Sequence, residues 1–132
     1  MTGEKTVSMT DEMRYGHCLM MMYGKNPDDK TRMNAQLQVT KFQSMPPEVK
    51  EKVLNIANAC AMLGLEYNQF IRVLDRAYGP HTTGSLEVGI SERVTGSARA
   101  EAVGVIQANL HNFNVHTDGN TLIISTKRTL QR

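Results

Sequence analysis

The sequence predicts an α+β protein in which a four-helix N-terminal region precedes a β-α-β-β unit with a small mixed sheet. Two observations support this prediction. All nine methionines lie at or before Met62, and between Thr10 and Tyr78 apolar residues recur every three or four positions. After Pro80, apolar and polar residues alternate instead, which is typical of half-buried strands. We expect a flexible tail over 1–9, a helical subdomain over 10–79 and a β-α-β-β subdomain over 80–132, packed together as one domain.

Four helices are expected before Gly79-Pro80: two at about 11–23 and 27–43, a third that starts at Met45-Pro46-Pro47 and runs to Leu63, and a fourth from Leu65 to Tyr78. Thr10 can cap the first helix with its hydroxyl oxygen. Asn26 is the candidate cap of the second helix, with Pro27 in its first turn. That second helix is mostly polar and should be the most exposed. Gly64 separates the third and fourth helices, which have the clearest apolar stripes.

The second part should contain strands at about 86–90, 113–116 and 122–124, with a helix at 97–110 between the first two. A right-handed crossover makes the first two strands parallel, either as neighbours or with one strand between them. Asp118-Gly119 suits a two-residue hairpin turn. The solvent face of the sheet should carry Glu87, Asn114 and His116. Its edges invite pairing with another chain, so a homo-oligomer through a sheet edge is one hypothesis.

Composition sets the broad class. A chain of 132 residues with 40% apolar content can bury a core as a single domain. Charges are nearly balanced in both parts, with ten Lys/Arg against nine Asp/Glu before Gly79, so neither part is a basic module. Cys18 and Cys60 lie in apolar helical patterns and should be reduced core residues. No secretion signal or membrane-spanning run is visible, and we expect a cytoplasmic protein without a cofactor.

The stretch around Gly64 resembles a helix-turn-helix motif. Such a motif has a small residue four places before a turn glycine and apolar residues at set distances after it, and the matching positions here are Cys60, Gly64, Leu65, Phe70 and Val73. The resemblance implies DNA contacts from the following helix. The candidate nucleic-acid-binding residues are Asn68, Gln69, Arg72 and Arg76, with Lys127 and Arg128 near the C-terminus. The favoured alternative is a plain helical hairpin whose glycine caps the third helix.

Histidines suggest a third possibility. His81-Thr82-Thr83 and His116-Thr117-Asp118 resemble the paired signatures of two-histidine phosphoesterases, in which each histidine acts on the phosphate. The alternative is a loop histidine and an exposed strand histidine. No histidine or cysteine pair has metal-ligand spacing, and we expect no metal. Thr95-Gly96-Ser97 with Arg99 could hold an anion at a helix start, although such starts are mostly plain caps.

The function that the sequence favours is a non-enzymatic binding protein: a small regulator, inhibitor or assembly subunit that acts through protein–protein contacts. Methionine is flexible and adapts to varied partners, so the run Met20-Met21-Met22 is a candidate interface, together with Asn114 and His116 on the sheet. A helix-turn-helix-like nucleic-acid-binding regulator is the alternative, and a two-histidine phosphoesterase is the third possibility.

Overall fold

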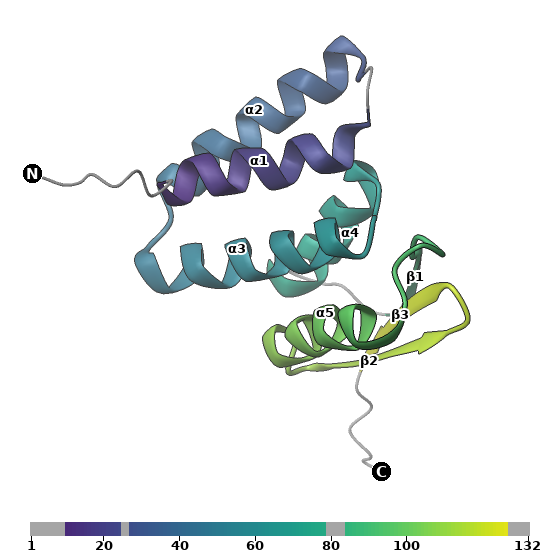
Figure 1. Ribbon diagram of the computed structural model, residues 1–132. Helices are drawn as coiled ribbons and strands as arrows, with labels where there is room; N and C mark the ends of the chain where they lie inside the picture. Colours follow the sequence, from purple (N-terminus) through teal and green to yellow (C-terminus); the bar gives the residue numbers. More distant parts are fainter. Residues whose placement is uncertain (1–9, 25–26, 79–83, 127–132) are drawn as a thin grey trace, which may run out of the picture.

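The protein is built of four layers (Figure 1). The structure is a computed structural model that describes residues 10–24, 27–78 and 84–126. The α1–α2 pair forms one outer layer, α3 and α4 lie beneath it, α5 comes next, and a three-stranded sheet closes the other side. The described elements are α1 (Asp11–Tyr23), α2 (Asp29–Gln43), α3 (Pro47–Met62), α4 (Tyr67–Tyr78), β1 (Ser85–Gly89), α5 (Gly96–Asn109), β2 (Phe113–Asp118) and β3 (Thr121–Thr126). The predicted α+β class and element order are confirmed. The 1–9 tail and the Gly79-Pro80 break lie outside the described residues.

The first two helices begin at side-chain caps. Thr10 accepts a hydrogen bond from the Met13 backbone N–H at 3.2 Å, as predicted. The second helix begins at Asp29, two residues later than expected, because Asp28 rather than Asn26 supplies the cap. Its Oδ1 accepts from the Thr31 backbone N–H at 2.8 Å. A carboxylate placed there also meets the positive end of the helix dipole.

Gly64 ends α3 in a Schellman motif. The Leu65 N–H donates to the Cys60 carbonyl at 3.1 Å and the Gly64 N–H donates to the Ala61 carbonyl at 3.0 Å. The φ angle of Gly64 is +74°, and a Cβ placed on it would lie 2.6 Å from the Cβ of Ser91. Glycine is therefore required here both by the left-handed turn and by the close approach of the β1–α5 connection.

The sheet has the order β1-β3-β2, and both strand pairs are antiparallel. The first two strands are parallel to each other with β3 between them, which is one of the two predicted arrangements. The expected mixed sheet is thus antiparallel in every described pair. The central place of β3 has a physical reason. Its run Leu122-Ile123-Ile124 is the most apolar of the three strands, and a central strand is covered by partners on both edges.

The hairpin turn lies one residue later than predicted. Asp118 pairs with Thr121 across the ladder, so the two turn residues are Gly119 and Asn120. Gly119 has φ of +62°, and no described residue other than a glycine has a positive φ. A glycine in the first turn position with a conventional second residue is the type II′ arrangement, which matches the twist of an antiparallel pair.

One cluster of buried residues extends from α1 to β3. On the helical side, the rings of Tyr15 and Phe42 stack with centroids 4.5 Å apart, and Phe70 meets Tyr15 edge-on at 6.3 Å. On the sheet side, α5 covers the buried face, where five strand side chains point inward: Leu86, Val88, Val115, Leu122 and Ile124. α3 lies between α1 and α5 and contacts both, so it joins the two parts.

Candidate functional site

The apolar surface of this protein is concentrated on the outer α1–α2 layer. Met13, Met20 and Met21 on α1 expose 56%, 64% and 57% of their surface. On α2, Met33 and Leu37 expose 70% and 51%. These five residues, named here the methionine face, include most of the large exposed apolar side chains in the described residues, the others being Met62 and Tyr78. Apolar exposure gathered on one layer is typical of a contact surface.

A groove of about 400 Å³ runs between α1 and α2 on this layer. Met13 and Met20 form one wall at positions i and i+7 of α1, with His17 between them. The remaining lining residues are small, apolar or neutral: Gly16, Tyr23, Ala35, Gln36 and Val39. Among the described residues, none that lines the groove is acidic. We call this feature the α1–α2 groove.

Gly16 lies in the interior of α1, where glycine costs about 1 kcal/mol relative to alanine. Its own fold does not require it. No described atom lies within 4 Å of the position that a Cβ would occupy, and its φ is not positive. The missing side chain leaves the wall of the groove low at this point. Gly104 in α5 is equally open, so an open glycine alone does not mark a site, but Gly16 also lines the groove, where a missing side chain allows close approach of a ligand.

The structure separates the predicted methionine run. Met20 and Met21 are exposed, whereas Met22 points into the core and exposes 4% of its surface. Three consecutive helix residues span about 200° of the helix circumference, so they cannot all face the same way. We therefore leave Met22 out of the candidate surface. Sequence reasoning missed Met13, Gly16 and the α2 residues, although the spacing of Met13 and Met20 around a glycine could have pointed to them.

The outer face of the sheet is polar. The ladder aligns Glu87, Ile123 and His116 in one row across the three strands, and Ser85, Ser125 and Asn114 in the next. His116 and Asn114 are exposed on β2, which is one edge of the sheet. At that edge, the Gln107 Nε2 of α5 donates to the Val115 carbonyl at 2.9 Å. Self-association through a sheet edge stays a prediction.

The residues proposed to contact nucleic acid are divided by the fold. Asn68 and Arg72 are exposed on α4, while Gln69 and Arg76 are partly buried. The Nε of Arg76 is buried without a hydrogen-bond partner among the described residues. Tyr67 is buried and donates its hydroxyl to the Asn34 side chain at 3.2 Å. Lys127 and Arg128 lie outside the described residues.

Charge gives little support to a nucleic-acid interface. Of the 15 cations and 13 acids in the chain, five cations and one acid lie outside the described residues, which leaves ten cations and twelve acids in the part that the structure describes. Those outside are Lys5, Lys25, Lys127, Arg128 and Arg132, with Glu4. Binding to a phosphate backbone requires a cationic surface. The described body carries no cationic excess.

Arg99, considered above for anion binding, is already occupied. Its guanidinium donates to the carbonyls of Val94, Ser91 and Gly119 at 2.8, 3.2 and 2.8 Å, and to the Asn120 side chain at 2.8 Å. It thereby ties the start of α5 to the β2–β3 turn and to the β1–α5 connection. Thr95 precedes the helix without a side-chain cap bond. We assign Arg99 a structural role.

The cysteines and histidines show no converging chemistry in the described residues. Cys18 and Cys60 are free and buried, and burial raises the pKa of both thiols, so neither is held as a thiolate. No group of three His, Cys, Asp or Glu residues in the described ranges is placed to hold a metal ion. His81, the proposed partner of His116, lies outside the described residues, so the phosphoesterase hypothesis stays a prediction.

Comparisons of this chain with protein-family models, curated proteins and solved structures found no match. In the described ranges, no helix combines the length and the apolar character that crossing a bilayer requires.

Proposed function

We propose that this protein is a non-enzymatic binding protein that holds an amphipathic helix of a partner protein in the α1–α2 groove. The observation that carries the proposal is the pairing of the exposed Met13 and Met20 with Gly16, whose missing side chain serves no contact inside the fold. Helix-in-groove recognition uses an apolar channel between helices and anchors spaced along one face of the incoming helix.

The dimensions of the groove suit this occupant. Met13 to Tyr23 covers about 15 Å of helix axis at 1.5 Å per residue, which is close to three turns of a docked helix. Gly16 is small, and small residues let helix axes approach closely, at about 8 Å rather than 10 Å. Methionine walls adapt to the shape of the anchors.

The charges around the groove indicate which charge the partner helix should carry. The groove lining contains His17 and no acid, and Arg32 lies one turn before Gln36 on the same stripe of α2. Arg32 is exposed and forms no ion pair with a described residue. The partner helix should therefore present apolar anchors to the groove and acidic residues beside them, because opposite charges at the rim guide association.

A matched pair of glycine variants tests the proposal. Gly16→Leu fills the groove, while Gly104→Leu makes the same change in α5, also in open space but away from the groove. Tagged wild-type protein and both variants would be used to capture partners from native extract, with quantitative mass spectrometry as the readout. We expect a protein that wild type and Gly104→Leu retain and that Gly16→Leu loses. Equal capture by all three proteins would contradict the proposal.

A further inference from the structure

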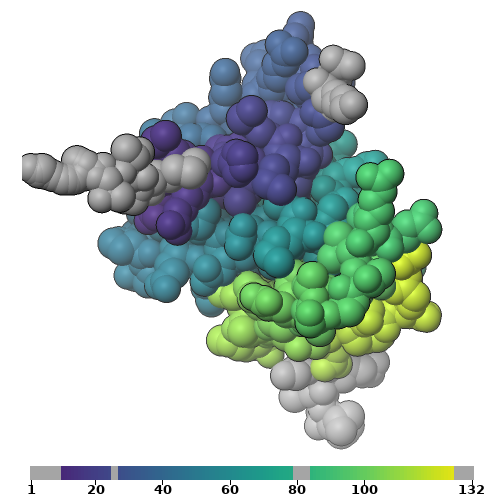
Figure 2. All heavy atoms as spheres, viewed as in Figure 1, coloured from purple at the N-terminus to yellow at the C-terminus, as the bar shows by residue number. Residues whose placement is uncertain are grey.

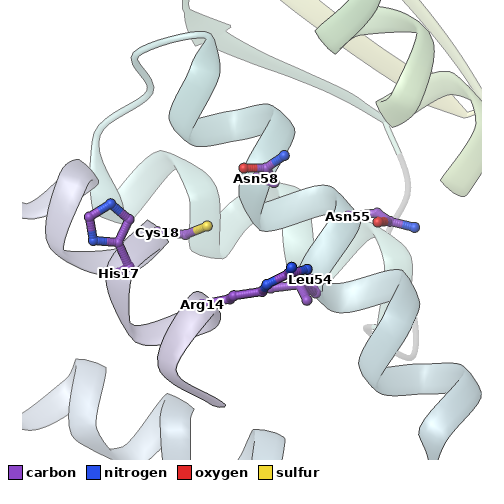
Figure 3. A pocket seen from close by; sticks show the side chains of 6 residues that line it. All are labelled: Arg14, His17, Cys18, Leu54, Asn55 and Asn58. Carbon is purple, nitrogen blue, oxygen red and sulfur yellow. The ribbon is translucent and has the colours of Figure 1, made fainter. Parts of the chain in front are cut away.

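A second, polar depression lies on the other side of α1, in the seam with α3 (Figure 2). It has a volume of about 290 Å³. Figure 3 shows the side chains that line it, Arg14, His17 and Cys18 from α1 and Leu54, Asn55 and Asn58 from α3, with His17 and Asn55 at opposite edges of the view. We call it the α1–α3 notch. It is separate from the methionine face, and among the residues lining the two depressions only His17 belongs to both.

The notch combines hydrogen-bond donors with an apolar floor. Arg14, His17, Asn55 and Asn58 are exposed around it, whereas Cys18 is buried and Leu54 is partly buried beneath them. A guanidinium offers a planar fork of donors that fits a carboxylate, and the two carboxamides add further donors. Donors that line a depression with an apolar floor suit a ligand with a charged head and a small apolar body.

The charge of Arg14 is not neutralised by the fold. Among the described residues, none that lines the notch is acidic, and Asp11 lies one turn before Arg14 on α1. The Glu12 carboxylate, two residues away, is paired with Lys50 at 3.1 Å. Glu101 lines the neighbouring groove between α3 and α5, across the ridge formed by Asn55 and Asn58. Arg14 itself forms no ion pair with a described residue. One uncompensated cation matches a singly charged acid better than a phosphate dianion.

We infer that the α1–α3 notch binds a small organic monocarboxylate, with Arg14 holding the carboxylate, Asn55 and Asn58 donating to it or to a neighbouring polar atom, and Cys18 and Leu54 contacting the apolar body. The volume of about 290 Å³ favours a small ligand, because it lies just below the range of pockets that hold drug-sized molecules. This inference does not depend on the proposed function.

Titration of the full chain followed by ¹⁵N NMR tests this site. The probes are butyrate, its neutral isostere butyramide, and inorganic phosphate. We expect butyrate to shift the side-chain amide signals of Asn55 and Asn58 saturably, with a Kd on the order of 1 mM, which corresponds to one weakly bound small ligand. Butyramide should bind at least about tenfold more weakly, because it lacks the charge that the guanidinium recognises.

Arginine variants separate the site from general charge effects. Arg14→Gln should weaken butyrate binding about tenfold. Arg72→Gln, an exposed arginine on α4, is the matched control and should leave binding unchanged. Both changes lie on the surface, and far-UV circular dichroism checks that the fold is kept. Unsaturable shifts, equal binding of butyrate and butyramide, tighter binding of phosphate, or unchanged binding in Arg14→Gln would each overturn the inference.

Discussion

The α1–α2 layer and the open face of the sheet are the two outer surfaces of this fold, and they treat apolar residues in opposite ways. Five large apolar side chains are exposed on α1 and α2, but no described residue after Tyr78 is a large exposed apolar residue. On the sheet, Leu86, Val88, Val115, Leu122 and Ile124 are buried, and the outer face carries Glu87, Asn114 and His116 around a half-buried Ile123. The sheet therefore buries large apolar side chains of the kind that the α1–α2 layer exposes.

The difference makes the methionine face the candidate binding surface of the described residues. α2 buries only Ala35 and Phe42, so polar residues at Met33 and Leu37 would cost its packing little. Gly16 likewise weakens α1 without serving a contact in the fold. Exposed apolar residues lower solubility and a helical glycine lowers helix stability. Such residues are expected at binding surfaces when they do not stabilise the fold.

The largest effects should come from the shared core. Phe42→Ala on the helical side should lower the free energy of unfolding by about 3–5 kcal/mol, and Ile124→Ala on the sheet by about 2–5 kcal/mol, because both side chains are fully buried. All four tyrosines precede Gly79, so tyrosine fluorescence reports on the helical part alone. In urea unfolding, Ile124→Ala should lower the fluorescence midpoint together with the circular dichroism midpoint. A fluorescence midpoint that stays in place would mean that the two parts unfold separately.

The next largest effect on stability is expected from Arg99. Arg99→Ala removes a guanidinium that serves three carbonyls and one side chain, at least two of them in partly buried bonds, and should cost about 2 kcal/mol. Arg99→Lys keeps the charge but not the fork, so it should recover less than half of that loss. Chemical denaturation of the three proteins gives the comparison. If lysine restored full stability, charge rather than directed hydrogen bonding would explain the residue.

Gly64→Ala should be destabilising by about 1–2 kcal/mol, since alanine is strained at a φ of +74° and its Cβ would press on Ser91. Gly104→Ala is the matched control. Its helical position is open, so alanine should raise stability by about 0.5–1 kcal/mol. Thermal unfolding of both variants measures the contrast. Equal stability of Gly64→Ala and wild type would show that the contact between α3 and the β1–α5 connection is not tight.

The smallest effects on stability should be on the two outer surfaces. Met20→Glu and His116→Ala each change an exposed side chain and should alter the free energy of unfolding by less than about 0.5 kcal/mol. Their effects on partner binding should differ. Met20→Glu should weaken it about tenfold or more, as expected when an interface anchor is replaced by a charge, and His116→Ala should leave it unchanged. Titration calorimetry with the captured partner measures the affinity of both variants. A larger loss of affinity in His116→Ala than in Met20→Glu would show that the partner binds to the sheet.

Local rules predicted most of the fold. The 3.6-residue stripes, the Thr10 cap and the alternation after Pro80 gave the elements, since each depends on near neighbours in the chain. The sequence allowed two arrangements, with β1 and β2 as neighbours or with β3 between them. The choice depends on which strand is stabilised most by hydrogen-bonded partners on both edges. The role of Arg99 was hidden for a similar reason. Its acceptors Gly119 and Asn120 lie 20 and 21 residues away, and only folding brings them within reach.

The candidate site was less predictable than the fold. Met20 and Met21 could be named from their run, but the partner wall of the groove is on α2, and Ala35 and Val39 have no pattern that assigns them to a surface. The α1–α3 notch was invisible for the same reason. Arg14 and Asn58 line one depression only because α1 and α3 pack side by side.

Photo-crosslinking inside the native cell tests the central claim most directly. A benzophenone amino acid would replace Met20 in one protein and His116 in another, so that the two outer surfaces are compared under the same conditions. The account predicts a discrete crosslinked partner from position 20, absent when Gly16→Leu is added, and none from position 116. A crosslink from position 116 alone, or one from position 20 that survives Gly16→Leu, would contradict it.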